Sequence, residues 1–238
     1  MSDTSISLNK FISSTGICSR READKWIEAG RVCINGQLAR KGNRVESGDE
    51  VTLDGKPIQP KAQPVYIALH KPPGITCTTD RKDKDNIIDF VRHPQRIFPI
   101  GRLDKASSGL ILLTNDGDIV NKILREENQH QKEYIVRVNR PITSAFVHKM
   151  SNGLPILGTT TKRCVVEKLG QYSFRIILTQ GLNRQIRRMC EFLQYKVVTL
   201  KRVRIMHIRL GKLPQGEWRE LSGPELTALN QHLLNSKK

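Results

Sequence analysis

The sequence has no long apolar run. No stretch approaches the roughly 18 to 20 consecutive apolar residues that a membrane-spanning helix needs, so we expect no membrane partner. The first residues carry no basic segment followed by an apolar one, and we therefore expect no secretory signal. Hydrophobic residues make up 37% of the 238 residues and charged residues 26%, which predicts a folded globular chain of one large or one large and one small domain.

Paired cysteines and clustered metal ligands are also missing. The five cysteines, at positions 18, 33, 77, 164 and 190, are odd in number and contain no CxxC pair, which argues against a disulfide framework and a zinc ribbon. The six histidines show no ligand spacing, and no GxGxxG turn is present. We expect a reduced, cytoplasmic protein that uses no metal and no cofactor.

Positive charge is what the sequence has in excess, with a net charge of +17. Residues 1–64 hold 10 Lys and Arg against 8 Asp and Glu, whereas residues 65–238 hold 30 against 15. Between Arg184 and Arg209 there are eight basic residues and a single acidic one. A solubilising charge would spread more evenly, so this clustering predicts a nucleic acid partner.

The first sixty residues predict two helices and a small sheet. Leu8 to Ile12 has helical spacing, and Ser19 with Glu22 matches the capping box that begins a second helix, which Gly30 would end. Asn35-Gly36 and Asp54-Gly55 are typical of tight turns between strands.

Residues 59–64 contain two prolines and predict a linker to a larger unit. In that unit, apolar runs predict strands near 65–69, 110–113, 134–138, 174–178, 197–198, 203–205 and 208–210, and helices near 87–91, 119–124, 185–193 and 224–234. Strands and helices mix without a regular βαβ alternation, so the predicted fold class is α+β.

The N-terminal unit, which we place at residues 5–61, resembles the S4 RNA-binding domain. The resemblance lies in LNKFISSTGICSRREADKWIEAGRVCINGQ, residues 8–37, and in GDEV, residues 48–51. It implies that the second helix offers Arg20, Arg21 and Lys25 to RNA. A charged face on a capped helix is also commonly just solvated.

Three segments of the second unit resemble one enzyme family. They are HKPPGITCT at 70–78, GRLDKASSGLILLTNDGD at 101–118 and GLNRQIRRMCEFL at 181–193. Together they are similar to the RsuA/RluB/RluE/RluF family of RNA pseudouridine synthases. The resemblance implies a catalytic domain over 65–238 with a mixed, mainly antiparallel sheet flanked by helices. It also implies isomerisation of a specific uridine in ribosomal RNA, with the large-subunit (23S) RNA as the expected substrate.

This isomerisation needs a carboxylate more than any cofactor. It breaks the bond from ribose C1′ to N1 of uracil and forms one from C1′ to C5, so no atom enters or leaves. By resemblance Asp104 attacks the ribose, or first removes the C2′ proton to give a glycal; both routes stay open. Asp104 lies just before the turn Ser107-Ser108-Gly109, and an isolated aspartate at such a place more commonly caps the turn by a hydrogen bond to its backbone. A glycosidase pair of Asp104 with Asp116 or Asp118 is rejected, because the intervening strand would separate them too far.

Other site residues follow from the same resemblance. Arg187 would keep the carboxylate of Asp104 ionised, and its planar fork suits that task. Tyr134 would stack on the extruded base and assist removal of the C5 proton, although a tyrosine in a strand is more commonly a core residue. The expected RNA contacts are Arg102, Lys105, Arg184, Gln185, Ile186 and Arg188, with Ile186 as an apolar pocket wall and Arg188 pointing away from Asp104.

Two alternatives remain open. The same chemistry could act on a transfer RNA anticodon stem-loop of similar shape. A non-catalytic S4-type RNA-binding or ribosome assembly factor would explain the charge and the first 61 residues, but not the later segments. We take a monomer as the default oligomeric state.

Overall fold

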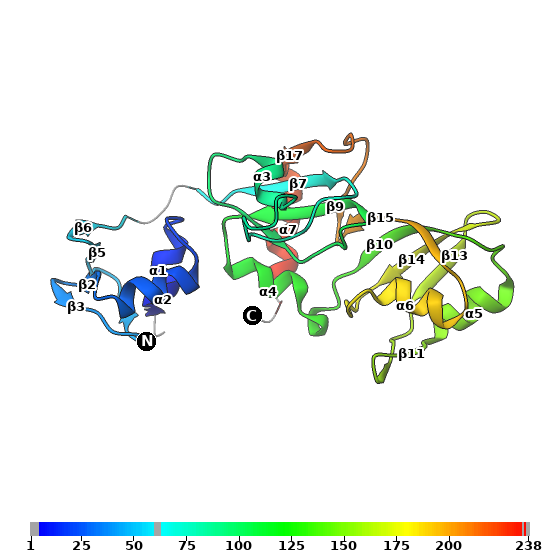
Figure 1. Cartoon of the computed structure of the whole chain (residues 1–238), viewed down its shortest axis with the longest axis horizontal. Coiled ribbons are helices and arrows are strands. Elements are labelled where there is room, and N and C mark those ends of the chain that lie inside the picture. The colour runs from blue at the N-terminus through cyan, green and yellow to red at the C-terminus, as the bar shows by residue number, and fades with distance from the viewer. Residues whose placement is uncertain (1–4, 60–62, 235, 237–238) are drawn as a thin grey trace. The chain divides into compact units, whose positions relative to one another are not determined.

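The computed structural model describes residues 5–59, 63–234 and 236. The chain forms two compact units: residues 1–64 with His93–Arg96, and residues 65–92 with 97–238. Part of the predicted linker, residues 60–62, and the last residues of the two predicted domains lie outside the described residues. Figure 1 shows the helices and strands of both units.

The N-terminal unit is built on two helices with local stop and start signals. Helix α1 spans Leu8–Ser14 and α2 spans Arg20–Glu28. The Ser19 hydroxyl accepts a hydrogen bond from the Glu22 amide at 3.1 Å. This is one of the two hydrogen bonds of the predicted capping box. Leu8 and Ile12 of α1 pack with Ala23 and Ile27 of α2. The helical spacing of apolar residues therefore explains the core of this unit.

The strands of this unit are short. They are β1 (Ile6–Ser7), β2 (Val32–Ile34), β3 (Gln37–Leu38), β4 (Arg44–Val45), β5 (Val51–Leu53) and β6 (Lys56–Pro57). Strands β3-β2-β5-β6 form one antiparallel sheet, and β1 pairs with β4. Asn35-Gly36 and Asp54-Gly55 have positive φ at both positions, as two-residue hairpin turns of this type require.

The second unit contains one large sheet. Its strands are β7 (Tyr66–Lys71), β8 (Phe98–Ile100), β9 (Ser108–Thr114), β10 (Lys132–Val138), β13 (Val165–Lys168), β14 (Ser173–Leu178), β15 (Val197–Ile205), β16 (Ile208–Arg209) and β17 (Trp218–Glu220). The order is β13-β14-β10-β15-β9-β7-β17, with β16 beside β15 and β8 beside β9. Within the described chain only β9 and β15 pair in parallel, so the predicted α+β class and mainly antiparallel sheet are confirmed.

Helices cover both faces of the β7–β9 half of this sheet. Alternate residues of β9 point to opposite faces: Leu110 and Leu112 pack with α4 (Asp118–Leu124) and α7 (Gly223–Leu234). Ile111 and Leu113 pack with α3 (Ile87–Val91) on the other face. Because β9 is buried on both faces, it is a continuous apolar run in the sequence.

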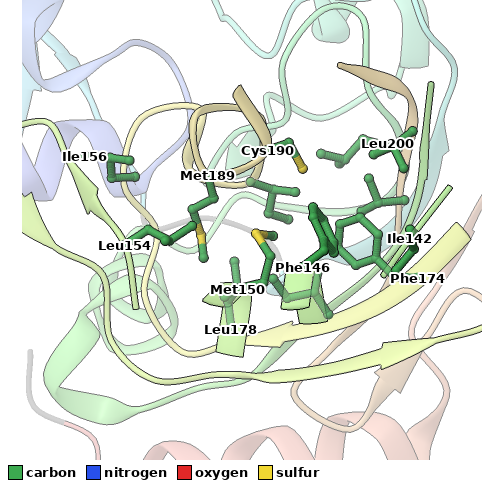
Figure 2. Packing of buried hydrophobic residues seen from close by; sticks show 14 residues of the cluster. Ile142, Phe146, Met150, Leu154, Ile156, Phe174, Leu178, Met189, Cys190 and Leu200 are labelled. Carbon is green, nitrogen blue, oxygen red and sulfur yellow. The ribbon is translucent and has the colours of Figure 1, made fainter. Parts of the chain in front are cut away.

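The other half of the sheet carries a second core. Helices α5 (Ser144–Asn152) and α6 (Gln185–Phe192) pack on β10 and β14. Figure 2 shows Phe146 and Met150 of α5 gathered with Met189 and Cys190 of α6 in one buried cluster. The ring of Phe174 from β14 lies 5.3 Å from that of Phe146. This packing fixes α6, and with it the basic segment that begins the helix. A short hairpin, β11 (Pro155–Ile156) with β12 (Thr159–Thr160), and the 3-10 helix η1 (Glu126–Asn128) complete the unit.

One sequence expectation about the elements was wrong in detail. The strands predicted at 197–198 and 203–205 are one strand, β15, because the charged residues between them lie in the middle of the sheet. Helix α5, the 3-10 helix η1 and strands β8, β11, β12, β13 and β17 of the second unit were not predicted. Helix α5 and strand β13 contact the sheet core through Phe146, Met150 and Val166, so their place depends on tertiary packing.

Candidate active site

A cavity of about 610 Å³ lies where the two halves of the large sheet meet. It is lined by the loop before β9, by β10 and β15, and by the start of α6. Asp104, Tyr134, Ile186 and Arg187, which are far apart in the sequence, all line it. A concave pocket with converging polar groups is the usual form of an active site.

The loop that carries Asp104 is held by backbone bonds. The Ser107 amide donates to the Asp104 carbonyl at 2.9 Å, and the Gly74 amide donates to the Lys105 carbonyl at 2.7 Å. The buried Lys71 ammonium adds bonds to the carbonyls of Pro72 and Ile75, both at 2.8 Å, and to that of Lys105 at 3.4 Å. The loop that follows β7 therefore braces the loop that carries Asp104.

Two guanidinium groups face the Asp104 carboxylate. Arg187 Nε lies 3.3 Å from Oδ2 and Arg184 Nη1 lies 3.5 Å from the same oxygen. Arg187 Nη2 also donates to the Ser107 hydroxyl at 3.0 Å. The Asp104 side chain keeps 31% of its surface exposed, whereas that of Arg187 keeps only 10%. The carboxylate is thus charge-compensated from the wall of the cavity and open toward its interior.

The start of α6 determines which arginines reach the cavity. Arg184 lies one residue before α6 in the left-handed region, with φ of 50°. Arg188 lies outside the cavity lining, and its guanidinium donates to the Asn183 carbonyl and side chain at 3.1 and 3.2 Å. Gln185 is buried and bonds to the Leu182 amide and the Gln180 side chain, which braces the loop.

Tyr134 joins two of the buried clusters of the second unit, because it packs against the cluster beneath α5 and α6 and against the cluster beneath α3. The Arg202 guanidinium carbon lies 6.0 Å from the centre of its ring. Ile186 is 5% exposed and lines the same cavity. The cavity wall thus contains one aromatic and one aliphatic side chain, the kinds of group that hold a planar base.

The sequence reasoning missed three buried cations near the cavity. Lys71 is fully buried, and burial lowers the pKa of its ammonium. The pKa of Lys132 is lowered to about 8, mainly by burial and next by the nearby Arg202 guanidinium, while Glu126 opposes the shift. Arg202 is 4% exposed. The signal that could have found Lys132 is its place two residues before Tyr134, which puts both on one face of β10.

Other expected site residues lie at the rim or outside the cavity. Arg102 and Lys105 are exposed and line it, and Lys105 Nζ also pairs with Asp85 at 2.8 Å. Cys77 and Cys190 are buried, and burial raises the pKa of both thiols, to about 12 for Cys190. Asp116 follows the far end of β9 and accepts from the Tyr66 hydroxyl at 3.0 Å. No group of three potential metal ligands occurs among the residues of the described ranges.

Comparison with known proteins identifies the family of this chain. A family model described as RNA pseudouridylate synthase matches residues 65–192, and an S4 domain model matches residues 7–51. The chain is 57% identical to the dual-specificity RNA pseudouridine synthase RluF of Salmonella typhi, over 96% of this chain and 80% of that protein. The chain belongs to the RNA pseudouridine synthase family.

A second relative and a solved structure support the same family assignment. This pseudouridine synthase is 35% identical to ribosomal large subunit pseudouridine synthase B of Bacillus subtilis, over 96% of this chain and 98% of that protein. A crystal structure of a pseudouridylate synthase superimposes with a TM-score of 0.69 at 29% identity and covers 94% of this chain and 99% of that one. The expected RsuA/RluB/RluE/RluF family is confirmed, and the similarity to RluF extends to the enzyme of Escherichia coli K12, at 56% identity over 98% of this chain and 81% of that protein.

As a pseudouridine synthase the protein is an isomerase that acts on RNA, and its N-terminal unit is an S4 domain. The predicted S4 contacts Arg20, Arg21 and Lys25 are all exposed on α2. Arg20 Nη2 lies 3.4 Å from Asn9 Oδ1 of α1. No helix within the described ranges is long and apolar enough to cross a membrane.

Proposed function

We propose that this pseudouridine synthase isomerises one uridine of large-subunit (23S) ribosomal RNA and that Asp104 is its nucleophile. The observation that carries the proposal is the Asp104 carboxylate, faced by Arg187 and Arg184 at 3.3 and 3.5 Å on the wall of the cavity. The relative from Bacillus subtilis, which is named a large-subunit enzyme, supports the choice of RNA.

Each residue of the cavity takes one task in this proposal. Arg187 compensates the charge of Asp104 in a partly closed site, where an unpaired carboxylate would be costly. Tyr134 and Ile186 hold the extruded base, and stacking returns about 1–3 kcal/mol toward the few kcal/mol that extrusion costs. Arg102, Lys105, Arg184 and Arg188 meet backbone phosphates, whereas Gln185 acts by holding the loop before α6.

The domains divide the work. We assign residues 5–61 to RNA docking through Arg20, Arg21 and Lys25, and residues 65–238 to catalysis. The protein would act as a monomer in the cytoplasm, where ribosomal RNA is found. A second substrate, a transfer RNA anticodon stem-loop, is favoured by the name of the 57% identical relative, which is a dual-specificity enzyme.

The test is quantitative pseudouridine detection in RNA from cells that lack the protein and are complemented with variants. Wild type restores the modification at the target uridine. Asp104→Asn keeps the shape of the side chain but removes the charge, so we expect no modification while RNA affinity changes by less than about threefold, because phosphate contacts supply most of the binding. Asp118→Asn, an exposed aspartate outside the cavity, is the matched control.

Several outcomes separate the candidates. Modification restored by Asp104→Asn removes this residue as nucleophile. Identical RNA with and without the wild-type protein would leave only a binding role. Loss of pseudouridine from ribosomal RNA alone, or from both ribosomal and transfer RNA, decides between single and dual specificity.

A further inference from the structure

Lys132 lies inside the cavity wall rather than at its rim. It is 8% exposed and lines the cavity together with Tyr134 and Arg202. Lys132 and Tyr134 are two residues apart on β10, and Arg202 of β15 is the cross-strand partner of Tyr134. All three side chains therefore belong to the same face of the sheet, where the base is proposed to stack.

The positive charge of this wall is not balanced. Among the residues that the structure describes, no atom accepts a hydrogen bond from Lys132 Nζ. Glu126 attracts the ammonium from η1, but its carboxylate pairs with Lys162 Nζ at 2.7 Å.

Arg202 adds to the excess. Its Nε donates to the Leu110 carbonyl at 2.7 Å, its Nη1 lies 3.5 Å from the Arg102 carbonyl, and its buried Nη2 has no partner in the described chain. Two neighbouring cations are costly to bury when the acceptors of their hydrogen bonds in the described chain are neutral carbonyls and the one attracting carboxylate, Glu126, is already paired with Lys162. Such an arrangement in a cleft indicates a site that receives an anion.

The reaction supplies an anion in this place. When the C1′–N1 bond breaks, its electron pair stays with uracil and spreads over N1, O2 and O4. Both routes give the same species: C1′ becomes esterified to Asp104, or Asp104 takes the C2′ proton and leaves a glycal. C5 then bonds to C1′; the ester carboxylate leaves, or the proton returns to C2′. N1 gains a proton and C5 loses one. The negative charge exists only between the two bond changes.

We propose that Lys132, supported by Arg202, binds the detached uracil anion through a carbonyl oxygen and is a further catalytic residue of this enzyme. This inference rests on the proposed role of Asp104 and on the base lying against Tyr134. A cation placed where charge develops accelerates the reaction without strengthening the binding of neutral uridine. A phosphate contact fits Lys132 less well, because the exposed Arg102 and Lys105 already occupy the rim.

The proposal sets a direction for the pH dependence. Lys132 must be protonated to bind the anion, so kcat/KM should fall as the pH rises through about 8, the pKa that burial and Arg202 give its ammonium. The charged and titratable groups around it are Arg202 on β15, Glu126 on η1 and His130 before β10. Arginine at position 132 stays charged at this pH, so Lys132→Arg should not show the decline of kcat/KM near pH 8.

The experiment uses the purified full chain and an unmodified transcript that contains the target uridine. Single-turnover rates and RNA dissociation constants are measured from pH 6.5 to 9 for wild type, Lys132→Met and Lys132→Arg. Lys132→Met should react about 100-fold more slowly, as expected for loss of one donor to a developing anion, with RNA affinity changed less than about threefold. Lys132→Arg should recover to within about tenfold and lose the decline near pH 8. Lys149→Met, an exposed lysine of α5 outside the cavity, should match wild type.

Three results would overturn the proposal: a wild-type rate in Lys132→Met, a loss confined to RNA affinity, or a wild-type rate that increases through pH 8, which would make Lys132 a base. Lys132→Gln, which keeps a polar donor of similar length, replaces Lys132→Met if thermal melting shows that the methionine variant does not fold.

Asp104→Asn, run in parallel, separates the two proposals. An active Asp104→Asn refutes the nucleophile assignment, whereas an inactive one beside a fully active Lys132→Met refutes the Lys132 inference alone.

Discussion

Arg187 holds the loop of Asp104 at two points. Two neighbouring donors of its guanidinium serve different groups: Nε lies 3.3 Å from the Asp104 carboxylate, and Nη2 donates to the Ser107 hydroxyl at 3.0 Å. A planar fork can serve both acceptors at once, whereas an ammonium is a single point of charge. At the scale of the residue, Arg187 therefore positions the nucleophile as well as compensating its charge.

Arg187→Lys should separate these two functions. The charge remains but one of the two contacts is lost, so we expect the single-turnover rate to fall about 10- to 100-fold, since small misplacements of reacting groups cost up to about 10²-fold. RNA affinity should stay within about threefold. Rates and melting temperatures would be compared with Arg209→Lys, an exposed arginine on β16. A full wild-type rate would show that charge alone is what Asp104 needs.

Two lysines of the catalytic unit are buried in different ways. The Lys71 ammonium has three carbonyl partners that belong to the loops it joins, so its role is structural. Lys132 has no such acceptor within the described ranges and lines the cavity. The burial of Lys71 is thus explained by the loops that it joins, and that of Lys132 by the substrate that we propose it binds. Burial alone would not distinguish them.

At the scale of the element, α7 is fastened at its first turn. The Glu225 carboxylate accepts two bonds from the Arg219 guanidinium of β17, both at 2.7 Å, and a third from the Ser222 amide at 2.9 Å. Ser222 and Glu225 form a capping box that the sequence analysis did not single out. These bonds lower the pKa of Glu225 to about 2, with the Arg219 hydrogen bonds as the main cause.

Glu225→Gln should lower the free energy of unfolding at pH 7 by about 1 kcal/mol, a figure discounted for the solvent around this pair. Because the pKa of Glu225 is lowered from 4.5 to about 2, its carboxylate stabilises the fold at any pH above 4.5. That contribution is lost as the pH falls from 4.5 toward about 2. The difference between wild type and variant should therefore shrink between pH 4.5 and 2. Urea unfolding at pH 7, 4.5 and 3 measures this difference in the free energy of unfolding. Glu217→Gln, at an exposed glutamate, is the control. A difference independent of pH would contradict the assignment.

At the scale of the whole molecule, the net charge overstates the basic surface. Of the eight basic residues between Arg184 and Arg209, Arg187 and Arg202 are buried, and Arg204 pairs with Glu133 at 2.8 Å. The clustering that predicted an RNA partner is therefore partly an internal feature. A register shift between β10 and β15 places Arg202 and Arg204, which are two residues apart, opposite the neighbouring residues Tyr134 and Glu133, so Arg202 reaches the cavity and Arg204 reaches Glu133.

The S4 unit should contribute affinity rather than chemistry. Replacing Arg21 and Lys25 by alanine removes two exposed charges of α2, spaced to share one face. If both meet phosphates, the slope of log affinity against log salt should lessen by about 1.4 to 1.8, while the rate at saturating enzyme stays unchanged. Filter binding at 50 to 200 mM salt measures the slope. Replacing Arg40 and Lys56, exposed elsewhere in the same unit, is the control; an equal change there would indicate a nonspecific charge effect.

The sequence alone determined the features that depend on neighbours along the chain. Ser19 caps α2 because its hydroxyl needs only the amide three residues later, and Asn35-Gly36 makes a tight turn because both residues tolerate positive φ. The apolar run of β9 similarly indicated a strand buried on both faces. The choice of Asp104 and Arg187 came from the family segments, and the structure brings their side chains together.

Only the tertiary structure decided what depends on distant partners. Gly109 lies in β9 with φ of +109°, and a Cβ there would collide with the backbone of Arg202, which is 93 positions away and pairs with it in parallel. No local pattern contains that constraint. The same applies to Lys132, whose ammonium has no hydrogen-bond acceptor among the described strands and loops around it. A local turn depends on few atoms, whereas an unbalanced charge in a cavity depends on every element that borders it.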